Sequence, residues 1–179
     1  MQLESAERLL RTPIDRVAPH RVPRKVRGLL WAELRDFGPF AGKRLNRNAK
    51  ACVKRGHSYE RQLHRELQRR NLGGQLFFQQ WILFADSNGL GWAQPDAYVL
   101  WDDLLLLMEA KLTQNKDADA QLLSLYLPLL RRIYQVPILC LQVCKNLRTA
   151  PPKLVDGPED LLSCPGPGVH TWHFLGGSG

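Results

Sequence analysis

The sequence has no long hydrophobic run. Even the stretch from Leu104 to Met108 has only the length of a strand, whereas a membrane-spanning helix needs roughly 18 consecutive apolar residues. The first residues also lack the charged-then-apolar layout of a secretory signal. We therefore expect a soluble cytoplasmic protein, or one of the host cytoplasm if the chain is viral.

Cysteine is scarce, and none of the four cysteines belongs to a C-x-x-C pair. Without a secretory signal, they do not indicate a disulfide framework. Internal repeats are absent as well. The length of 179 residues corresponds to one domain that is large enough for a substantial core.

Acidic residues are scarce in the first part of the chain. Residues 1–70 hold 18 Lys/Arg and 7 Asp/Glu, a balance of +11, whereas residues 71–179 balance at −3. This asymmetry favours a polyanion-binding surface beside a locally acidic region, although a basic surface used only for solubility is the alternative. The predicted nucleic-acid contacts are Lys43, Arg44, Lys54, Arg55, His57 and Lys116.

Apolar periodicity predicts an amphipathic helix over 57–72. Tyr59, Leu63 and Leu67 recur at four-residue spacing. Ser58 is the expected N-cap and Gly73-Gly74 the expected end. Before this helix, residues 1–54 form a basic extension, in which Leu29 to Leu34 suggest one or two helical turns.

The centre of the chain alternates between strand and helix patterns. Apolar and aromatic runs predict strands over 75–85, 90–101 and 104–112, with a turn at 86–89. A helix over 117–134 is expected to kink at Pro128, and a buried strand follows at 136–143. Residues 146–179 are Pro/Gly-rich, with an expected edge strand at 169–175 and a flexible tail.

A hairpin in this region carries three charges in register. If the turn centres on Asp102-Asp103, facing residues have numbers that sum to 205, so Asp96 faces Glu109. Lys111 lies two residues beyond Glu109 and therefore on the same face. Two carboxylates and an ammonium beside an apolar core favour a divalent-metal site for hydrolysis; a solvated surface pair is the alternative.

These residues and this element order resemble the PD-(D/E)XK nuclease superfamily, and most closely its RecB-type and virus-type members. Pro95-Asp96 and Glu109-Ala110-Lys111 are the two halves of its signature. The resemblance implies an α/β fold with a restriction-endonuclease-like core (α-β-β-β-α-β), a mixed sheet flanked by helices. This core spans 55–145, with the basic helical N-terminal extension over 1–54 and the C-terminal segment over 146–179.

The resemblance also implies a set of site residues. Asp96, Glu109, the Ala110 carbonyl and Glu60 would hold Mg²⁺ or Mn²⁺, and Lys111 would orient or deprotonate the attacking water. Gln121 would position the backbone or the lysine. The family places a tyrosine four residues after this glutamine, whereas Tyr126 follows by five, so Tyr126 is not included among the expected site residues.

The resemblance implies a metal-dependent deoxyribonuclease, an endonuclease or an exonuclease. It would hydrolyse double- or single-stranded DNA in DNA processing, repair, or phage or mobile-element biology. A homodimer or a larger DNA-processing complex stays open. The alternatives are a non-catalytic nucleic-acid-binding protein on a nuclease-like fold, and a dimeric junction-resolving or restriction-type endonuclease.

Overall fold

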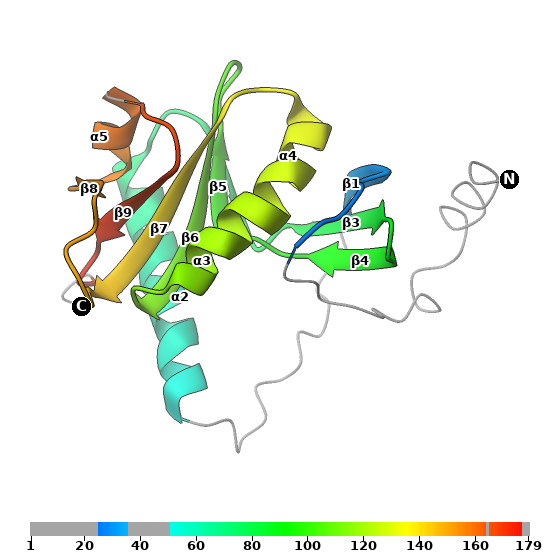
Figure 1. Ribbon diagram of the computed structural model, residues 1–179. Helices are drawn as coiled ribbons and strands as arrows, with labels where there is room; N and C mark the ends of the chain where they lie inside the picture. Colours follow the sequence, from blue (N-terminus) through cyan, green and yellow to red (C-terminus); the bar gives the residue numbers. More distant parts are fainter. Residues whose placement is uncertain (1–24, 36–50, 164, 177–179) are drawn as a thin grey trace, which may run out of the picture.

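Helices cover both faces of a mixed sheet in the computed structural model, which describes residues 25–35, 51–163 and 165–176. Helix α2 (Ala51–Arg70) covers one face. The helical segment α3 (Lys116–Gln121), η2 (Leu122–Tyr126) and α4 (Leu127–Tyr134) covers the other (Figure 1). The expectation of a mixed α/β fold with a helix-flanked sheet is confirmed. None of the described helices combines the length and apolar character that crossing a bilayer requires.

The described strands of the main sheet follow the order β2-β5-β6-β7-β9-β8. The β2-β5 and β5-β6 pairs are antiparallel, and the remaining pairs are parallel. The predicted edge strand at 169–175 is not at the edge, because the short strand β8 pairs with its outer side. Helix α5 (Pro158–Ser163) connects these two strands. The strand bounds are β2 Gln75–Phe78, β5 Ala97–Leu100, β6 Leu105–Thr113, β7 Ile138–Asn146, β8 Leu154–Val155 and β9 Val169–His173.

A second sheet joins β1 (Trp31–Arg35), β3 (Trp81–Asp86) and β4 (Gly89–Ala93) in the order β1-β3-β4. The helical turns predicted near Leu29 to Leu34 are therefore wrong. β1 pairs with β3 from Trp31↔Ala85 to Arg35↔Trp81. The open backbone edge of β3 satisfies this segment's hydrogen bonds, and that tertiary pairing overrides the local helical pattern.

The two sheets are linked by a bend in the long hairpin 75–100. Both strands predicted there are interrupted, one at Gln79 and the other between Gln94 and Asp96. Gln79 adopts a positive φ of 48°, and its N–H donates to the Asp96 carbonyl at 3.1 Å. The Gln94 side-chain amide donates to the Gln79 carbonyl at 2.7 Å. These bonds place Asp96 at the point where the hairpin leaves the main sheet.

The predicted register of the β5-β6 hairpin is confirmed. Ala97 pairs with Met108 and Leu100 with Leu105, so the numbers of each pair sum to 205. At the turn, the Trp101 N–H donates to the Leu104 carbonyl at 2.9 Å. Glu109 and Lys111 follow on β6, where the bend in the partner strand begins.

Helix α2 is longer than the sequence pattern predicts. It begins at Ala51, so Ser58 lies within the helix and is not its cap. It ends before Asn71, which has a left-handed φ of 48°, rather than at the glycines. Apolar periodicity marks only the part of a helix that packs, and the first turns project past the end of the sheet (Figure 1). The predicted divisions at 54–55 and 145–146 fall inside α2 and β7.

Two apolar cores lie on opposite sides of the sheet. Alternate residues of β6 face different helices: Leu106 and Met108 pack with α2, whereas Leu105 and Leu107 pack with the η2-α4 segment. The nine-residue strand is therefore buried on both faces until it reaches its charged end. Glu109 and Lys111 continue the row of Leu105 and Leu107.

Candidate metal centre

Asp96, Glu109 and Lys111 meet at the charged end of β6. The Asp96 carboxylate accepts the Ala110 N–H at 2.7 Å, replacing the ladder bond that is lost where the hairpin bends. The Lys111 ammonium donates to Oε1 of Glu109. The Glu109 side chain is only 2% exposed, whereas that of Lys111 is 33% exposed. The Lys111 ammonium therefore lies between the buried Glu109 carboxylate and the solvent.

The charge of Glu109 disfavours the ionisation of Asp96. Burial, followed by the charges of Glu109 and Glu60, raises the pKa of Asp96 well above its usual value. Burial also raises the pKa of Glu109, although Lys111 opposes that shift. Burial lowers the pKa of Lys111, but the nearby carboxylates outweigh burial and the pKa is raised overall. Such a site favours neutralisation, by protons or by a further cation.

One carboxylate oxygen has the surroundings expected of a cation ligand. Oε2 of Glu109 is buried and has no hydrogen-bond partner among the described residues. An orphaned buried carboxylate oxygen beside a second carboxylate fits a hard divalent cation. No set of three or more His, Cys, Asp or Glu side chains in the described ranges could share one metal ion. Asp96, Glu109 and the Ala110 carbonyl suit Mg²⁺, which usually retains several waters.

Glu60 lies on the flank of this pair without joining a shared cluster. Its carboxylate contacts His57 Nδ1 at 3.2 Å and the Gln79 side-chain amide at 3.5 Å. Its charge nevertheless contributes to the raised pKa values of Asp96 and Glu109. Glu60 therefore acts on the site electrostatically.

The predicted Gln121 reaches the site through Tyr126, which the sequence analysis had left out. The Gln121 amide donates to the Tyr126 hydroxyl at 2.5 Å, and this hydroxyl donates to the Gln94 carbonyl at 3.0 Å. Tyr126 is 3% exposed. Burial raises its pKa, and the charges of Glu109 and Asp96 add to this. Tyr126 therefore fastens the helical layer to the residue that precedes Pro95-Asp96.

A π-helical turn explains the five-residue spacing of this pair. The helix predicted over 117–134 contains the segment η2, in which the Leu127 N–H bonds to the Leu122 carbonyl, five residues back. A π-turn accommodates one extra residue per turn, so residues five apart lie on one side. Pro128 cannot donate to Ser124, and the Val26 N–H donates to that carbonyl instead at 2.8 Å.

Replacing Tyr126 with phenylalanine tests this link. The change keeps the ring but removes both bonds of the hydroxyl, which leaves the Gln94 carbonyl and the Gln121 amide to find new partners. We expect the free energy of unfolding to fall by about 1 kcal/mol, measured by urea denaturation. Tyr134→Phe is the matched control, because within the described residues its hydroxyl bonds only the Tyr98 hydroxyl, at 2.9 Å, so its loss frees no backbone group of the hairpin. An unchanged stability of Tyr126→Phe would contradict a fastening role.

Gln142 is a second residue that the sequence analysis missed. It lies beside Glu109 on β7 and is 1% exposed. Its amide donates to the Asn115 carbonyl at 2.7 Å and to the Asp119 carboxylate at 3.0 Å. It therefore ties the start of α3 to the sheet.

The missed residues have only weak sequence signals. Gln142 is a single polar residue in an apolar strand, and Gln79-Gln80 interrupt the apolar run 76–84. Polar residues inside such runs indicate internal hydrogen bonding. The sequence does not reveal their partners, because these come from distant elements.

The described residues among the predicted nucleic-acid contacts lie on α2 and at the start of α3. Lys54 and Arg55 are exposed in the first turns of α2, His57 is held by Glu60, and Lys116 is exposed at the start of α3. Lys43 and Arg44 lie outside the described residues.

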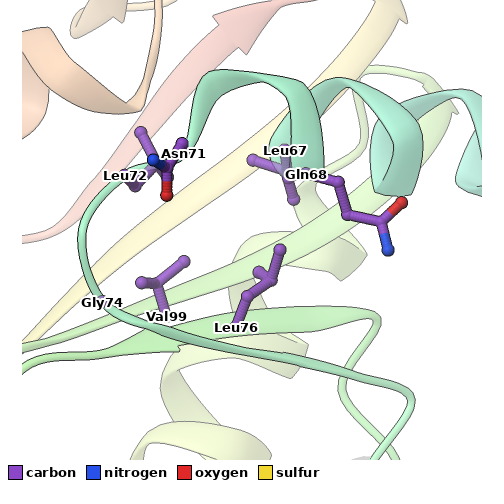
Figure 2. A pocket seen from close by; sticks show the side chains of 7 residues that line it. All are labelled: Leu67, Gln68, Asn71, Leu72, Gly74, Leu76 and Val99. Carbon is purple, nitrogen blue, oxygen red and sulfur yellow. The ribbon is translucent and has the colours of Figure 1, made fainter.

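A pocket of about 230 Å³ lies away from these charges. It is formed between the second half of α2 and strands β2 and β5 (Figure 2). Its lining contains no titratable side chain, so it adds no catalytic chemistry to the site. The lining residues are Leu67, Gln68, Asn71, Leu72, Gly74, Leu76 and Val99.

Comparisons with known proteins found no matching family model, no matching curated protein and no matching solved structure.

Proposed function

We propose that the chain is a Mg²⁺-dependent deoxyribonuclease of the PD-(D/E)XK type. The observation that carries this proposal is the contact set of Asp96, Glu109 and Lys111, in which Glu109 Oε2 is buried without a partner. The element order from α2 through the hairpin to β6, the α3-α4 segment and β7 supports it. Nucleic acid is the substrate class that suits the basic first 70 residues.

In this proposal, Asp96, Glu109 and the Ala110 carbonyl hold the cation. When bound, Mg²⁺ supplies Lewis-acid polarisation of the scissile phosphodiester. The Ala110 N–H keeps the Asp96 carboxylate in place. Tyr126 fixes the backbone at Gln94, two residues earlier. The fold thereby holds the two carboxylates in position even when Mg²⁺ is absent and they repel each other.

Lys111 has the second role in the proposed reaction. Its stem is partly buried and its ammonium adjoins the carboxylates, at the boundary between protein and solvent. From there it orients the attacking water and stabilises negative charge that develops on the phosphate.

A non-catalytic nucleic-acid-binding protein is the second candidate. One observation favours it: the Glu60 carboxylate is engaged by His57 and Gln79. Such a protein would bind nucleic acid through its basic surface without cutting it.

Cleavage assays with matched aspartate variants separate the two candidates. We expect the wild-type chain to cut DNA with Mg²⁺ and to stop when EDTA removes the metal. Asp96→Asn should lower the rate at least about 100-fold, because one of the two carboxylate ligands is lost. Asp102→Asn is the control, since Asp102 is exposed in the turn of the same hairpin. Linear and closed circular substrates distinguish exonuclease from endonuclease activity.

Two results would decide against the proposal. Equal cutting by Asp96→Asn and wild type would mean that the assigned site is wrong. Salt-sensitive binding without any cleavage would favour the non-catalytic candidate.

A further inference from the structure

The outer face of α2 carries a row of exposed cations. Each helical residue turns about 100° around the axis, so Lys54, Arg61 and Arg65 lie within one narrow arc. This arc is opposite Tyr59, Leu63 and Leu67, which are buried against the sheet. All three basic side chains are exposed. Arg61 and Arg65 are about 6 Å apart along the axis.

The cations of α2 differ in their partners. Within the described residues, Arg61 and Arg65 have no hydrogen bond or ion pair. Farther along the helix, Arg69 and Arg70 both bind Glu66, and their guanidinium groups lower the pKa of Glu66 to about 2. Arg70 also pairs with Glu159 at 2.6 Å. Positive charge is thus neutralised at the far end of α2 and available near its middle.

The available cations lie beside the row of α2 that carries Glu60, whose charge acts on the candidate metal centre. Glu60, His57 and His64 form the next row around the helix, toward the hairpin. Glu60 contacts Gln79, and the His64 ring packs against Phe78, tilted by 31° with centroids 4.1 Å apart. A chain that leaves the site across this row therefore meets Arg61 and Arg65 on the adjoining face of α2, about a quarter turn around the helix.

We propose that Arg61 and Arg65 form a phosphate-binding track that guides a nucleic-acid backbone to the metal centre. This inference rests on the proposed function for the identity of the polyanion. Guanidinium groups suit phosphates because they donate in a planar fork. The regular spacing and the lack of acidic partners leave both groups available to successive phosphates. Neither residue was among the nucleic-acid contacts predicted from the sequence.

Binding measured without cleavage tests the track. Fluorescence anisotropy of the full chain, in EDTA, would use a labelled duplex of about 20 base pairs and the corresponding single strand. In Arg61→Gln/Arg65→Gln we expect the duplex Kd to rise roughly 10- to 60-fold at about 0.1 M salt. The slope of log K against log salt should become shallower by roughly 1.8, because each phosphate contact releases about 0.9 counterion and the variant lacks two such contacts.

Arg131→Gln/Arg132→Gln is the matched control. It removes the same charge from exposed positions on α4, across the sheet from α2, and should change the Kd by no more than about twofold. Circular dichroism and thermal unfolding would verify that both variants fold, as expected for exposed helix positions.

Several outcomes would overturn the track. The first is unchanged DNA binding by the α2 variant, and the second is an equal loss of DNA binding in the control. The third is that the wild type binds polyglutamate more tightly than DNA and that this binding is lost in the α2 variant. The proposed function fails separately. A wild type that never cuts, yet binds DNA through Arg61 and Arg65, refutes the nuclease and supports the track. A wild type that cuts DNA while the α2 variant binds normally refutes only the track.

Discussion

Lys111→Met should strongly slow cleavage while Mg²⁺ binding persists. Methionine retains the partly buried stem of Lys111 but removes the ammonium that adjoins Glu109. The carboxylates of Asp96 and Glu109 remain. If the ammonium stabilises charge that develops on the phosphate, its loss should lower the cleavage rate by about 10²- to 10³-fold. Single-turnover cleavage and isothermal titration with Mg²⁺ measure the two properties independently.

Lys145→Met provides the control for this substitution. Lys145 lies on β7, next to the residue that pairs with Lys111, and its side chain is exposed. The same change there should leave both cleavage and Mg²⁺ binding unaltered. If Lys111→Met cleaved DNA at the wild-type rate, the assigned role of the lysine would be refuted. Loss of Mg²⁺ binding along with activity would instead show that Lys111 holds the carboxylates in place.

Asp96→Asn should make the metal-free protein more stable even though it inactivates the enzyme. The asparagine oxygen can still accept the Ala110 N–H, but the charge that repels Glu109 and Glu60 is gone. A single stabilising substitution commonly contributes about 0.5–2 kcal/mol, with lost activity as the usual cost. We expect the free energy of unfolding in EDTA to rise by about 2 kcal/mol near pH 8, measured by urea denaturation.

The direction of the pKa shift of Asp96 determines how the stability of the wild type changes with pH. Because the pKa of Asp96 is raised in the folded protein, the native state binds more protons than the unfolded state between the two pKa values. Wild-type stability must therefore fall as the pH rises through that window. The advantage of Asp96→Asn should accordingly shrink at acidic pH.

Mg²⁺ and a control substitution complete the test of Asp96. Added Mg²⁺ should stabilise the wild type more than Asp96→Asn, because the ion binds the folded site. Asp102→Asn, in the exposed turn, should change the unfolding free energy by less than about 0.5 kcal/mol. A metal-free Asp96→Asn protein that is less stable than wild type at pH 8 would contradict the repulsion inferred here.

The hairpin shows how much of the candidate site could be predicted from local sequence. A tight turn at Asp102-Asp103 sets the register of both strands, and side chains alternate between faces with a period of two. These rules depend only on residues close along the chain. They were sufficient to place Ala97 opposite Met108 and to put Asp96 near Glu109.

The errors occurred where distant segments decide the structure. Leu29 to Leu34 has a helical pattern, but β1 forms there because β3 provides an open edge some 50 residues later. The strand at Val169–His173 is internal because the two-residue β8 pairs with it. Such pairings depend on backbone hydrogen bonds, which local side-chain patterns do not encode.

The sequence by itself predicted the helix-flanked mixed sheet, and its local turn chemistry and periodicity determined the β5-β6 register that brings Asp96 beside the segment from Glu109 to Lys111. Only the tertiary structure decided how the helical layer meets that site. The π-turn brings Gln121 to Tyr126, and the Tyr126 hydroxyl reaches Gln94 across 32 residues of sequence. The physical reason is that a buried polar group must find a partner wherever the fold supplies one.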